Sequence, residues 1–265
     1  MLSSGDPQAH LLGFYAATMS FTPVGLPRPG FAVGGALGVI PSLSLEDRTV
    51  GFGGTKAEDA NRCPVYPRLT AAWMARAGFA VEAGYTPAAS VCGVEASVVS
   101  AAVSHRFSLA PTWDGVARVS LFSGSVEGDL TCSASDTANA ANQTCYRGSP
   151  SSDKLAPSAY GFDMAFAYRG DGTSRLEPYV LIGFNRETID FDVNYNRTLT
   201  QGALVGLPPL ADTNRLRAQL TRVHAGLGAA WVPLRWLALG GELYYEPGAL
   251  LTLRGSARAR FGGPR

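Results

Sequence analysis

The sequence predicts an all-β protein, a closed antiparallel up-and-down transmembrane β-barrel of about ten strands with an N-terminal plug-like segment. Three observations predict it. Apolar and polar residues alternate along segments of about ten residues, as in strands with two different faces. The connections after the second, fourth, sixth and eighth of these segments are short, and those after the first, fifth and seventh are long. Charged residues make up 16% of the chain, beside 31 glycines and 10% aromatic residues. We divide the chain into residues 1–30, packing in or under the barrel, and a barrel of residues 31–265.

The closing stretch, residues 250–261, shows the alternation most clearly. Leu251, Leu253 and Phe261 fall on one face, and Arg254 and Arg258 fall on the other. A soluble sandwich would place the apolar face in its core and the arginines in water. A membrane barrel would place the apolar face in lipid and the arginines in a hydrated lumen.

The N-terminal segment is not strand-like. Residues 11–21 can form about three helical turns before the breakers Pro23, Gly25 and Pro27, so we expect a short helix or an irregular segment. In the first predicted strand, residues 31–45, one face carries only small residues. These are Ala32, Gly34, Ala36 and Gly38. Small residues suit close approach by another segment, and the N-terminal segment is the obvious candidate.

The other predicted strands follow in order. They are residues 68–76, 79–86, 94–107, 116–130, 160–168, 179–193, 214–232, 237–245 and 250–261. The pattern of 94–107 does not fix which face is apolar. In 160–168, Phe162 and Phe166 lie between Tyr160 and Tyr168 on one face, as an apolar band between aromatic girdles requires.

The length of a connection depends on whether it follows an even-numbered or an odd-numbered predicted strand. The connections near Gly78, Pro111, Gly172 and Pro233 are short, whereas residues 46–67, 131–156 and 194–213 form long polar loops. Alternate connections of an up-and-down barrel share a rim, so one rim is smooth and the other is ragged. Outer-membrane barrels have short periplasmic turns and long external loops.

The four cysteines all fall on the predicted external rim. We expect Cys132–Cys145 within one loop and Cys63–Cys92 between neighbouring loops, as an oxidising compartment allows. Four unrelated thiols are the alternative. No Cys-x-x-Cys spacing occurs and no histidine lies near these loops, so neither zinc nor another metal is expected.

If the apolar faces meet lipid, five charged residues point into the lumen. They are Glu82, Asp163, Glu242, Arg254 and Arg258. Burying an unpaired charge is costly, so these residues need partners. If residues 247–249 form a three-residue hairpin loop, Glu242 lies directly opposite Arg254, and we predict an ion pair between them. A structural role for this pair is favoured over a role in binding.

Two resemblances add to this interpretation. Leu253, Gly255, Ala257, Ala259 and Phe261 resemble the C-terminal signature of bacterial outer-membrane barrels, in which alternate apolar residues lead to a final aromatic; here residues 262–265 follow it. Residues 20–26, with the run Phe21-Thr22-Pro23-Val24-Gly25-Leu26, resemble the Asn-Pro-Ala-Gly-Leu segment near the N-terminus of the long-chain fatty-acid channel family, with Thr22 in place of Asn. That resemblance implies an N-terminal hatch and passage of hydrophobic molecules.

The expected function is therefore a bacterial outer-membrane barrel that binds or passes a small hydrophobic molecule. The alternatives are a non-transporting structural or surface-interaction barrel acting through its external loops, and a soluble β-sandwich or lipocalin-like binder. A barrel of eight strands is just wide enough for its own side chains, and ten strands leave a little more room, for the N-terminal segment or one slim ligand. A wide aqueous pore is not expected. The expected partners are outer-membrane lipid and a small hydrophobic ligand. A net charge of +1 gives no reason to expect nucleic acid, and no cofactor is expected.

An enzyme is not expected. Ten-stranded proteases of the omptin type need acidic and histidine residues that converge at the external rim. Asp190 and Asp192 share a face near that rim, but His224 lies well down the following strand. No nucleophile elbow, phosphate loop or metal motif occurs elsewhere, so we assign no catalytic residue.

Overall fold

The fold is taken from a computed structural model of the chain. It describes residues 1–20, 23–51, 56–139, 145–146, 148–170, 175–197 and 210–262. The tight turn predicted near Gly172, and Phe21 and Thr22 of the second resemblance, lie outside these residues.

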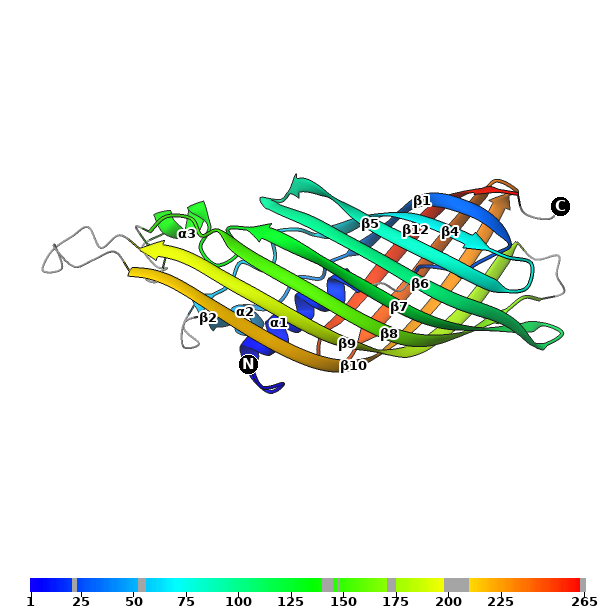
Figure 1. Cartoon of the computed structure of the whole chain (residues 1–265), viewed down its shortest axis with the longest axis horizontal. Helices are drawn as coiled ribbons and strands as arrows, with labels where there is room; N and C mark the ends of the chain where they lie inside the picture. The colour runs from blue at the N-terminus through cyan, green and yellow to red at the C-terminus, as the bar shows by residue number, and fades with distance from the viewer. Residues whose placement is uncertain are drawn as a thin grey trace, which may run out of the picture.

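Ten of the described strands close into one antiparallel barrel, in the order β1-β12-β11-β10-β9-β8-β7-β6-β5-β4 (Figure 1). Their bounds are β1 Gly30–Val39, β4 Val65–Met74, β5 Phe79–Val91, β6 Val94–Ala110, β7 Trp113–Gly128, β8 Asp153–Tyr168, β9 Leu176–Arg197, β10 Leu210–Leu234, β11 Leu237–Glu246 and β12 Leu250–Phe261. The prediction of an all-β closed barrel with ten strands is confirmed. We call the end with the hairpins near Gly78, Pro111 and Pro233 the turn rim, and the opposite end the loop rim.

Side chains alternate between the two faces as the sequence predicts. In β12, Leu251, Leu253 and Phe261 are exposed on the outer face, whereas Thr252 and Arg254 are buried inside. In β6, whose facing the sequence left open, Val98 and Ala102 point inward, and Val99 and Val103 point outward.

The outer face of the barrel is apolar, and aromatic residues gather on it at the turn rim. Those exposed there are Phe31, Trp73, Phe79, Trp113, Tyr168, Trp231, Trp236 and Phe261. Rings from the two strands that close the barrel meet at this rim, with the centroids of Phe31 and Phe261 6.4 Å apart. Tyr85, Tyr160 and Tyr245 are exposed nearer the loop rim. The barrel therefore has a belt of apolar side chains around its outside.

The predicted strand ends were wrong at the loop rim. β1 ends at Val39 instead of residue 45, and the short helix α2, Leu45–Arg48, begins after the capping residue Ser44. β8 begins at Asp153, inside the predicted loop 131–156. β9 and β10 extend into the predicted loop 194–213. Cys92 and Gly93 alone connect β5 to β6; both have positive φ, 57° and 77°, as a type I′ hairpin turn requires.

The barrel wall is much taller on one side. β9 and β10 pair along their whole lengths, from Trp231↔Leu176 to Leu210↔Arg197, but β10 pairs with β11 only up to Ala225↔Tyr245. In Figure 1, β6 to β10 run to the left well beyond β11, β12 and β1. The helix α1, Pro7–Met19, lies within this half-open part. On the side where the strands are short, α1 is covered by α2 and by the hairpin of β2, Thr49–Gly51, and β3, Lys56–Ala57. No described helix is long and apolar enough to cross a membrane.

Candidate functional site in the barrel interior

The described parts of the N-terminal segment, residues 1–20 and 23–29, contact the inside of the barrel at levels from the loop rim to the turn rim. Near its start, the amide of Leu2 donates a hydrogen bond to the carbonyl of Arg217 in β10 (2.8 Å). Near its end, Arg28 forms an ion pair with Glu177 at the start of β9 (2.7 Å). β1 begins at Gly30, so the chain enters the barrel wall only after it has traversed the interior.

Helix α1 is buried mainly from Leu11 to Met19, where most of its residues are apolar, whereas Pro7 and His10 near its start are exposed. It contains no acidic or basic residue in its first or last turn, and Pro7 stands at its N-terminus, where a missing N–H costs nothing. One side packs against inward-facing residues of β6 to β10, including Phe122, Ile189 and Leu220. The other side packs against Val50 and Ala60 of the segment that follows β1.

Arginines of the wall hold the main chain of the N-terminal segment. Arg68 Nη2 donates to the carbonyl of Met19 (2.8 Å), one of the groups that a helix C-terminus leaves without an intrahelical partner. Further down, Arg118 Nη1 donates to the carbonyl of Pro23 (3.2 Å) and Arg106 Nη1 to that of Pro27 (3.2 Å). The prolines lack an N–H, so carbonyls dominate the polar groups that this segment offers.

A cluster of charges fixes the segment at the turn rim. Arg106 donates to Asp114 Oδ2 through Nε (3.0 Å) and Nη2 (2.6 Å), and it also pairs with Glu177. Glu177 in turn pairs with Arg28 of the N-terminal segment. The wall and the segment thus share one network.

The five predicted lumen-facing residues are all buried inside the barrel, where they form two adjoining groups. In the first, Glu82 lies 3.5 Å from Arg258 Nη1 and 3.9 Å from Arg118 Nε. Asp163 lies 3.8 Å from the same Arg118 nitrogen. These ion pairs are longer than direct hydrogen bonds, a spacing that suits bridging water.

The second group contains the predicted pair across the β11–β12 hairpin. Glu242 is registered opposite Arg254, and Arg254 Nη1 lies 3.9 Å from Glu242 Oε1. Tyr179 donates its hydroxyl hydrogen to Glu242 Oε2 (2.9 Å) and accepts a bond from the amide of Gly25 (2.9 Å). Glu242 is therefore linked to both the wall and the N-terminal segment.

A third charged group near α1 was missed by the sequence reasoning. Arg222 Nη1 lies 3.6 Å from Glu246, and its Nε lies 3.9 Å from Glu187. Tyr244 donates to Glu246 (3.2 Å). A Cβ at Gly13 of α1 would lie 2.1 Å from Arg222 Nη2, so the helix backbone rests against this group. The alternation along β10 could have predicted that Arg222 points into the barrel, because Arg222 lies on the same inward face as His224.

The residues considered for catalysis do not meet. His224 is buried in the lumen, where its ring lies 5.3 Å from that of Tyr244. Asp190 and Asp192 instead pair with Arg217 and Arg215 of the neighbouring strand, at 3.5 and 2.5 Å. Among the residues that the structure describes, no group of three His, Cys, Asp or Glu side chains is placed to hold a metal ion.

An apolar chamber of about 150 Å³ lies between α1 and the wall, just inside the loop rim. Its lining comes from the end of α1, from the segment around Ala60, and from β4 to β8, with Met19, Val126 and Leu155 among its side chains. Asp59 and Arg62, which form an ion pair (2.7 Å), are at its edge. We call this cavity the apolar chamber.

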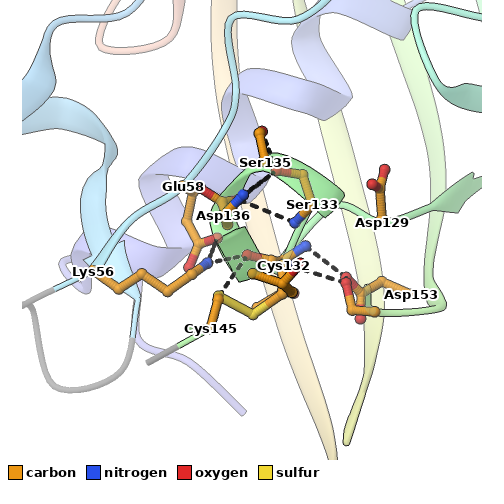
Figure 2. The surroundings of a disulfide bond; sticks show 12 residues. Lys56, Glu58, Asp129, Cys132, Ser133, Ser135, Asp136, Cys145 and Asp153 are labelled. Carbon is orange, nitrogen blue, oxygen red and sulfur yellow. Dashed lines mark hydrogen bonds and ion pairs between the residues drawn. A yellow bond between two sulfur atoms is a disulfide. The ribbon is translucent and has the colours of Figure 1, made fainter. Parts of the chain in front are cut away.

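Two disulfides stand at the loop rim. The structure joins Cys63 to Cys92 and Cys132 to Cys145, the two pairs that the sequence predicts. The second bridge is buried beside α3, Ala134–Ala138, whose capping residue Ser133 exchanges hydrogen bonds with Asp136 (Figure 2).

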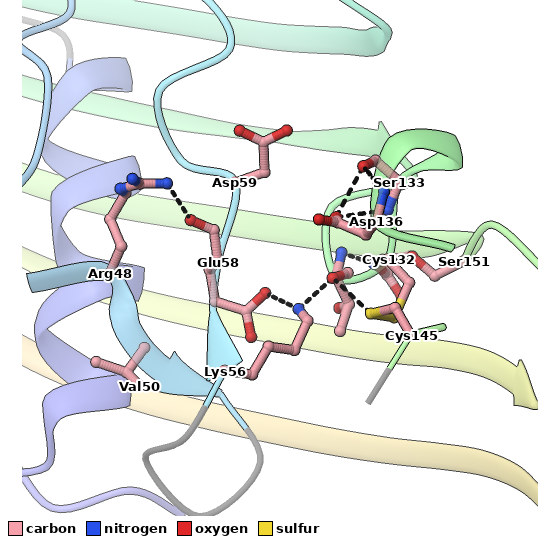
Figure 3. A network of polar contacts seen from close by, with 12 residues as sticks. Arg48, Val50, Lys56, Glu58, Asp59, Cys132, Ser133, Asp136, Cys145 and Ser151 are labelled. Atoms are coloured by element: carbon pink, nitrogen blue, oxygen red, sulfur yellow. Dashed lines mark hydrogen bonds and ion pairs between the residues drawn. A yellow bond between two sulfur atoms is a disulfide. The ribbon is translucent and has the colours of Figure 1, made fainter. Parts of the chain in front are cut away.

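Lys56 connects the loop between β1 and β4 to the loop between β7 and β8. Its ammonium pairs with Glu58 (2.5 Å) and donates to the carbonyl of Thr131, next to Cys132 (Figure 3). Arg48 Nη1 donates to the Glu58 carbonyl (3.0 Å). Burial raises the pKa of Glu58 above its usual value, although the Lys56 ammonium opposes this.

Comparisons with known proteins give structural similarities only. No protein-family model matches the chain, and no curated protein matches it in sequence. Solved structures similar to it include the KdgM porin in complex with disordered oligogalacturonate, with a TM-score of 0.35, 9% identity and coverage of 87% of this chain and 99% of that one. The attachment invasion locus protein Ail of Yersinia pestis has a TM-score of 0.32, 12% identity and coverage of 88% and 100%. The Pseudomonas putida toluene transporter TodX has a TM-score of 0.32, 10% identity and coverage of 92% and 90%. Similarity at this level says nothing of what this chain binds.

Proposed function

We propose that the protein is a bacterial outer-membrane β-barrel, closed by its own N-terminal segment, that binds or passes a small hydrophobic molecule. The apolar belt supports the membrane placement, because an exposed apolar surface of this extent would be a liability in water. Buried arginines and carboxylates inside the barrel fit a hydrated lumen. Disulfides at the loop rim fit an oxidising compartment, and the long connections at this rim favour it as the external one.

The N-terminal segment acts as a plug in this proposal. Its support is the series of bonds from Arg68, Arg118 and Arg106 to successive carbonyls of the segment. Each bond to a charged donor contributes about 1.5–3 kcal/mol, so the segment is held at several depths at once. The consequence is a barrel without a continuous wide pore, and we expect little ion conductance from it in planar bilayers.

The apolar chamber is the observation that carries the ligand. Its volume of about 150 Å³ equals that of an engineered apolar protein cavity that stays dry and binds benzene. A site of this size and lining suits a molecule built around one aromatic ring or a short aliphatic body. Outer-membrane lipid is the other expected partner, through the belt.

The test uses the binding of fluorobenzene to the barrel in lipid nanodiscs, followed by ¹⁹F NMR. Ala96 lines the chamber, so Ala96→Phe fills it. Ala101 lies on the outer face of the same strand, between the inward Ala102 and Ser100, so Ala101→Phe is the matched control for added bulk. We expect a protein-bound signal from the native protein and from Ala101→Phe, and its loss in Ala96→Phe. The same signal in all three proteins would locate fluorobenzene in lipid and contradict the proposal.

The cross-linked loops favour a second candidate, a non-transporting barrel that presents a rigid surface to a macromolecule. Lys56 and Arg62 join different loops, through Thr131 and Asp129 respectively, in addition to the two disulfides. This candidate gains if no fluorobenzene binds while whole cells lose attachment to a surface when residues 131–152 are replaced by a short linker.

A further inference from the structure

We propose that the apolar chamber is the upper part of a route that follows the inner face of β1 to the turn rim, and that this route suits a small apolar molecule carrying a negative charge. The proposal deepens the ligand-binding function proposed above and depends on it.

Two smaller cavities continue from the chamber along the N-terminal segment. Thr18 and Tyr66 line both the chamber and a middle cavity of about 30 Å³. Val24 lines both this middle cavity and a lower cavity of about 40 Å³, which reaches Phe31 and Arg260 near the turn rim. The shared residues make the three cavities neighbours in a single row.

The row follows β1 because the inner face of that strand is made of small residues. Ala36 and Gly38 line the middle cavity, and Ala32 lines the lower one. Larger residues of the same strand, Val33 and Val39, are exposed on the outer face. The small face noted in the sequence thus leaves space beside the N-terminal segment, which elsewhere is held tightly by the wall.

Arginines dominate the charged residues along the lower part of the route. Arg68 and Arg254 line the middle cavity, and Arg28, Arg258 and Arg260 line the lower one. No aspartate or glutamate is among the described residues that line either cavity. Three of these arginines pair with carboxylates that do not line the cavities: Arg254 with Glu242, Arg258 with Glu82 and Arg28 with Glu177. An anion is therefore favoured at these levels and a cation is not.

Arg68 and the end of α1 separate the chamber from the middle cavity. Arg68 donates to the Met19 carbonyl (2.8 Å) and to that of Ser20 (3.3 Å), and its guanidinium lies 5.3 Å from the ring centroid of Tyr66. The middle and lower cavities are each large enough for only about one or two water molecules. A ring-sized molecule passes only when the N-terminal segment shifts, and its negative group can replace the carbonyls as a partner for Arg68.

The experiment measures efflux of two permanently charged molecules from proteoliposomes. Benzenesulfonate and benzyltrimethylammonium share a phenyl ring and differ in the sign of their charge. All four native cysteines are in disulfides, so Ala36→Cys introduces a single reactive thiol in the middle cavity. The folded variant is modified with methyl or benzyl methanethiosulfonate, and Val33→Cys, exposed on the outer face of the same strand, is the matched control. Fluorobenzene binding to the chamber is measured on the same samples.

We expect efflux of benzenesulfonate at least tenfold faster than that of benzyltrimethylammonium. The benzyl adduct at residue 36 should slow it at least tenfold, with chamber binding retained, and adducts at residue 33 should leave it unchanged. Chamber binding without benzenesulfonate efflux, or efflux unaffected by the benzyl adduct at residue 36, overturns the route but leaves the binding function. Equal efflux of both ions overturns the charge preference. If the native protein binds no fluorobenzene in the chamber, the proposed ligand-binding function itself is wrong.

Discussion

Closure of the barrel between its first and last strands depends on Gly34. An ideal Cβ at this position would lie 1.9 Å from the carbonyl oxygen of Ala257 and 2.7 Å from the Cα of Arg258. Both are backbone atoms of β12, the strand paired with β1. An ordinary contact begins at 3.4 Å, so Gly34→Ala requires the two strands to separate by about 1.5 Å (3.4 minus 1.9) at that point.

Gly35 offers a control at the next residue. The nearest atom to a Cβ there is the Arg68 carbonyl oxygen at 3.7 Å, an ordinary contact. Overpacking costs about 1–3 kcal/mol, and hydrogen bonds broken within lipid add several more because no water replaces them. We expect Gly34→Ala to lose roughly 3 kcal/mol or more, or to fail to close, and Gly35→Ala to change stability by less than about 0.5 kcal/mol.

The assay is urea unfolding of the barrel from lipid vesicles, followed by tryptophan fluorescence, with electrophoretic mobility before and after heating as a check for closure. Equal unfolding midpoints for the two variants would refute the reasoning. So would a loss in Gly35→Ala as large as that in Gly34→Ala.

Three further predictions concern the buried charges and the loops. Arg254→Met alone leaves Glu242 buried beside Tyr179 without its cation and should lower the free energy of unfolding by about 3 kcal/mol, whereas adding Glu242→Leu should restore most of it; a double variant no more stable than the single one would contradict this. Replacing Cys132 and Cys145 by alanine opens a loop with a sequence separation of 13 and should destabilise that loop by about 3 kcal/mol, seen as faster proteolysis within residues 131–152, while an unchanged rate would count against it. Because burial raises the pKa of Glu58, the folded protein holds that proton more tightly than the unfolded chain. Its contribution to stability is complete below the unfolded pKa and is lost as pH rises through the folded pKa. Hydrogen exchange around residues 56–60 should therefore quicken as pH increases from the normal glutamate range, after correction for intrinsic rates, and Glu58→Gln should remove that increase; the same pH dependence in both proteins would exclude Glu58 as its cause.

The sequence predicted the barrel and the facing of its strands, apart from β6, because the two faces meet different surroundings. In β12, every second residue meets the outside and the others meet a charged interior, so the pattern repeats every two residues. At the loop rim, the alternation of apolar and polar residues no longer marks the strands. Asp192 and Arg215 form an exposed ion pair on β9 and β10 beyond the belt, where the outer face no longer needs apolar residues. The backbone pairing continues there, but the sequence resembles a polar loop.

The alternation predicted which residues face inward, but the partner of an inward-facing residue was predictable only where the two lie close together in the chain. The opposition of Glu242 and Arg254 follows from the length of one hairpin. The group around Arg222 takes its carboxylates from the two strands paired with β10, so it depends on the register of β9, β10 and β11. Arg68 binds the end of α1, so this contact depends on how the helix packs inside the barrel. A further reason is that the carbonyls used by Arg68 and Arg118 are backbone groups, which leave no trace in a residue pattern.

The path of the N-terminal segment constrains the order of folding. Ser20 is bonded to Arg254, 234 residues away, and Val24 to Ser256, 232 residues away. The N-terminal segment therefore lacks these partners until β12 is in place. Because β12 also pairs with β1 to close the barrel, we expect the N-terminal segment to enter before these two strands pair. We therefore expect two steps to compete during assembly: entry of the N-terminal segment into the barrel and pairing of β1 with β12. Contacts of very high sequence separation are then part of the slow step.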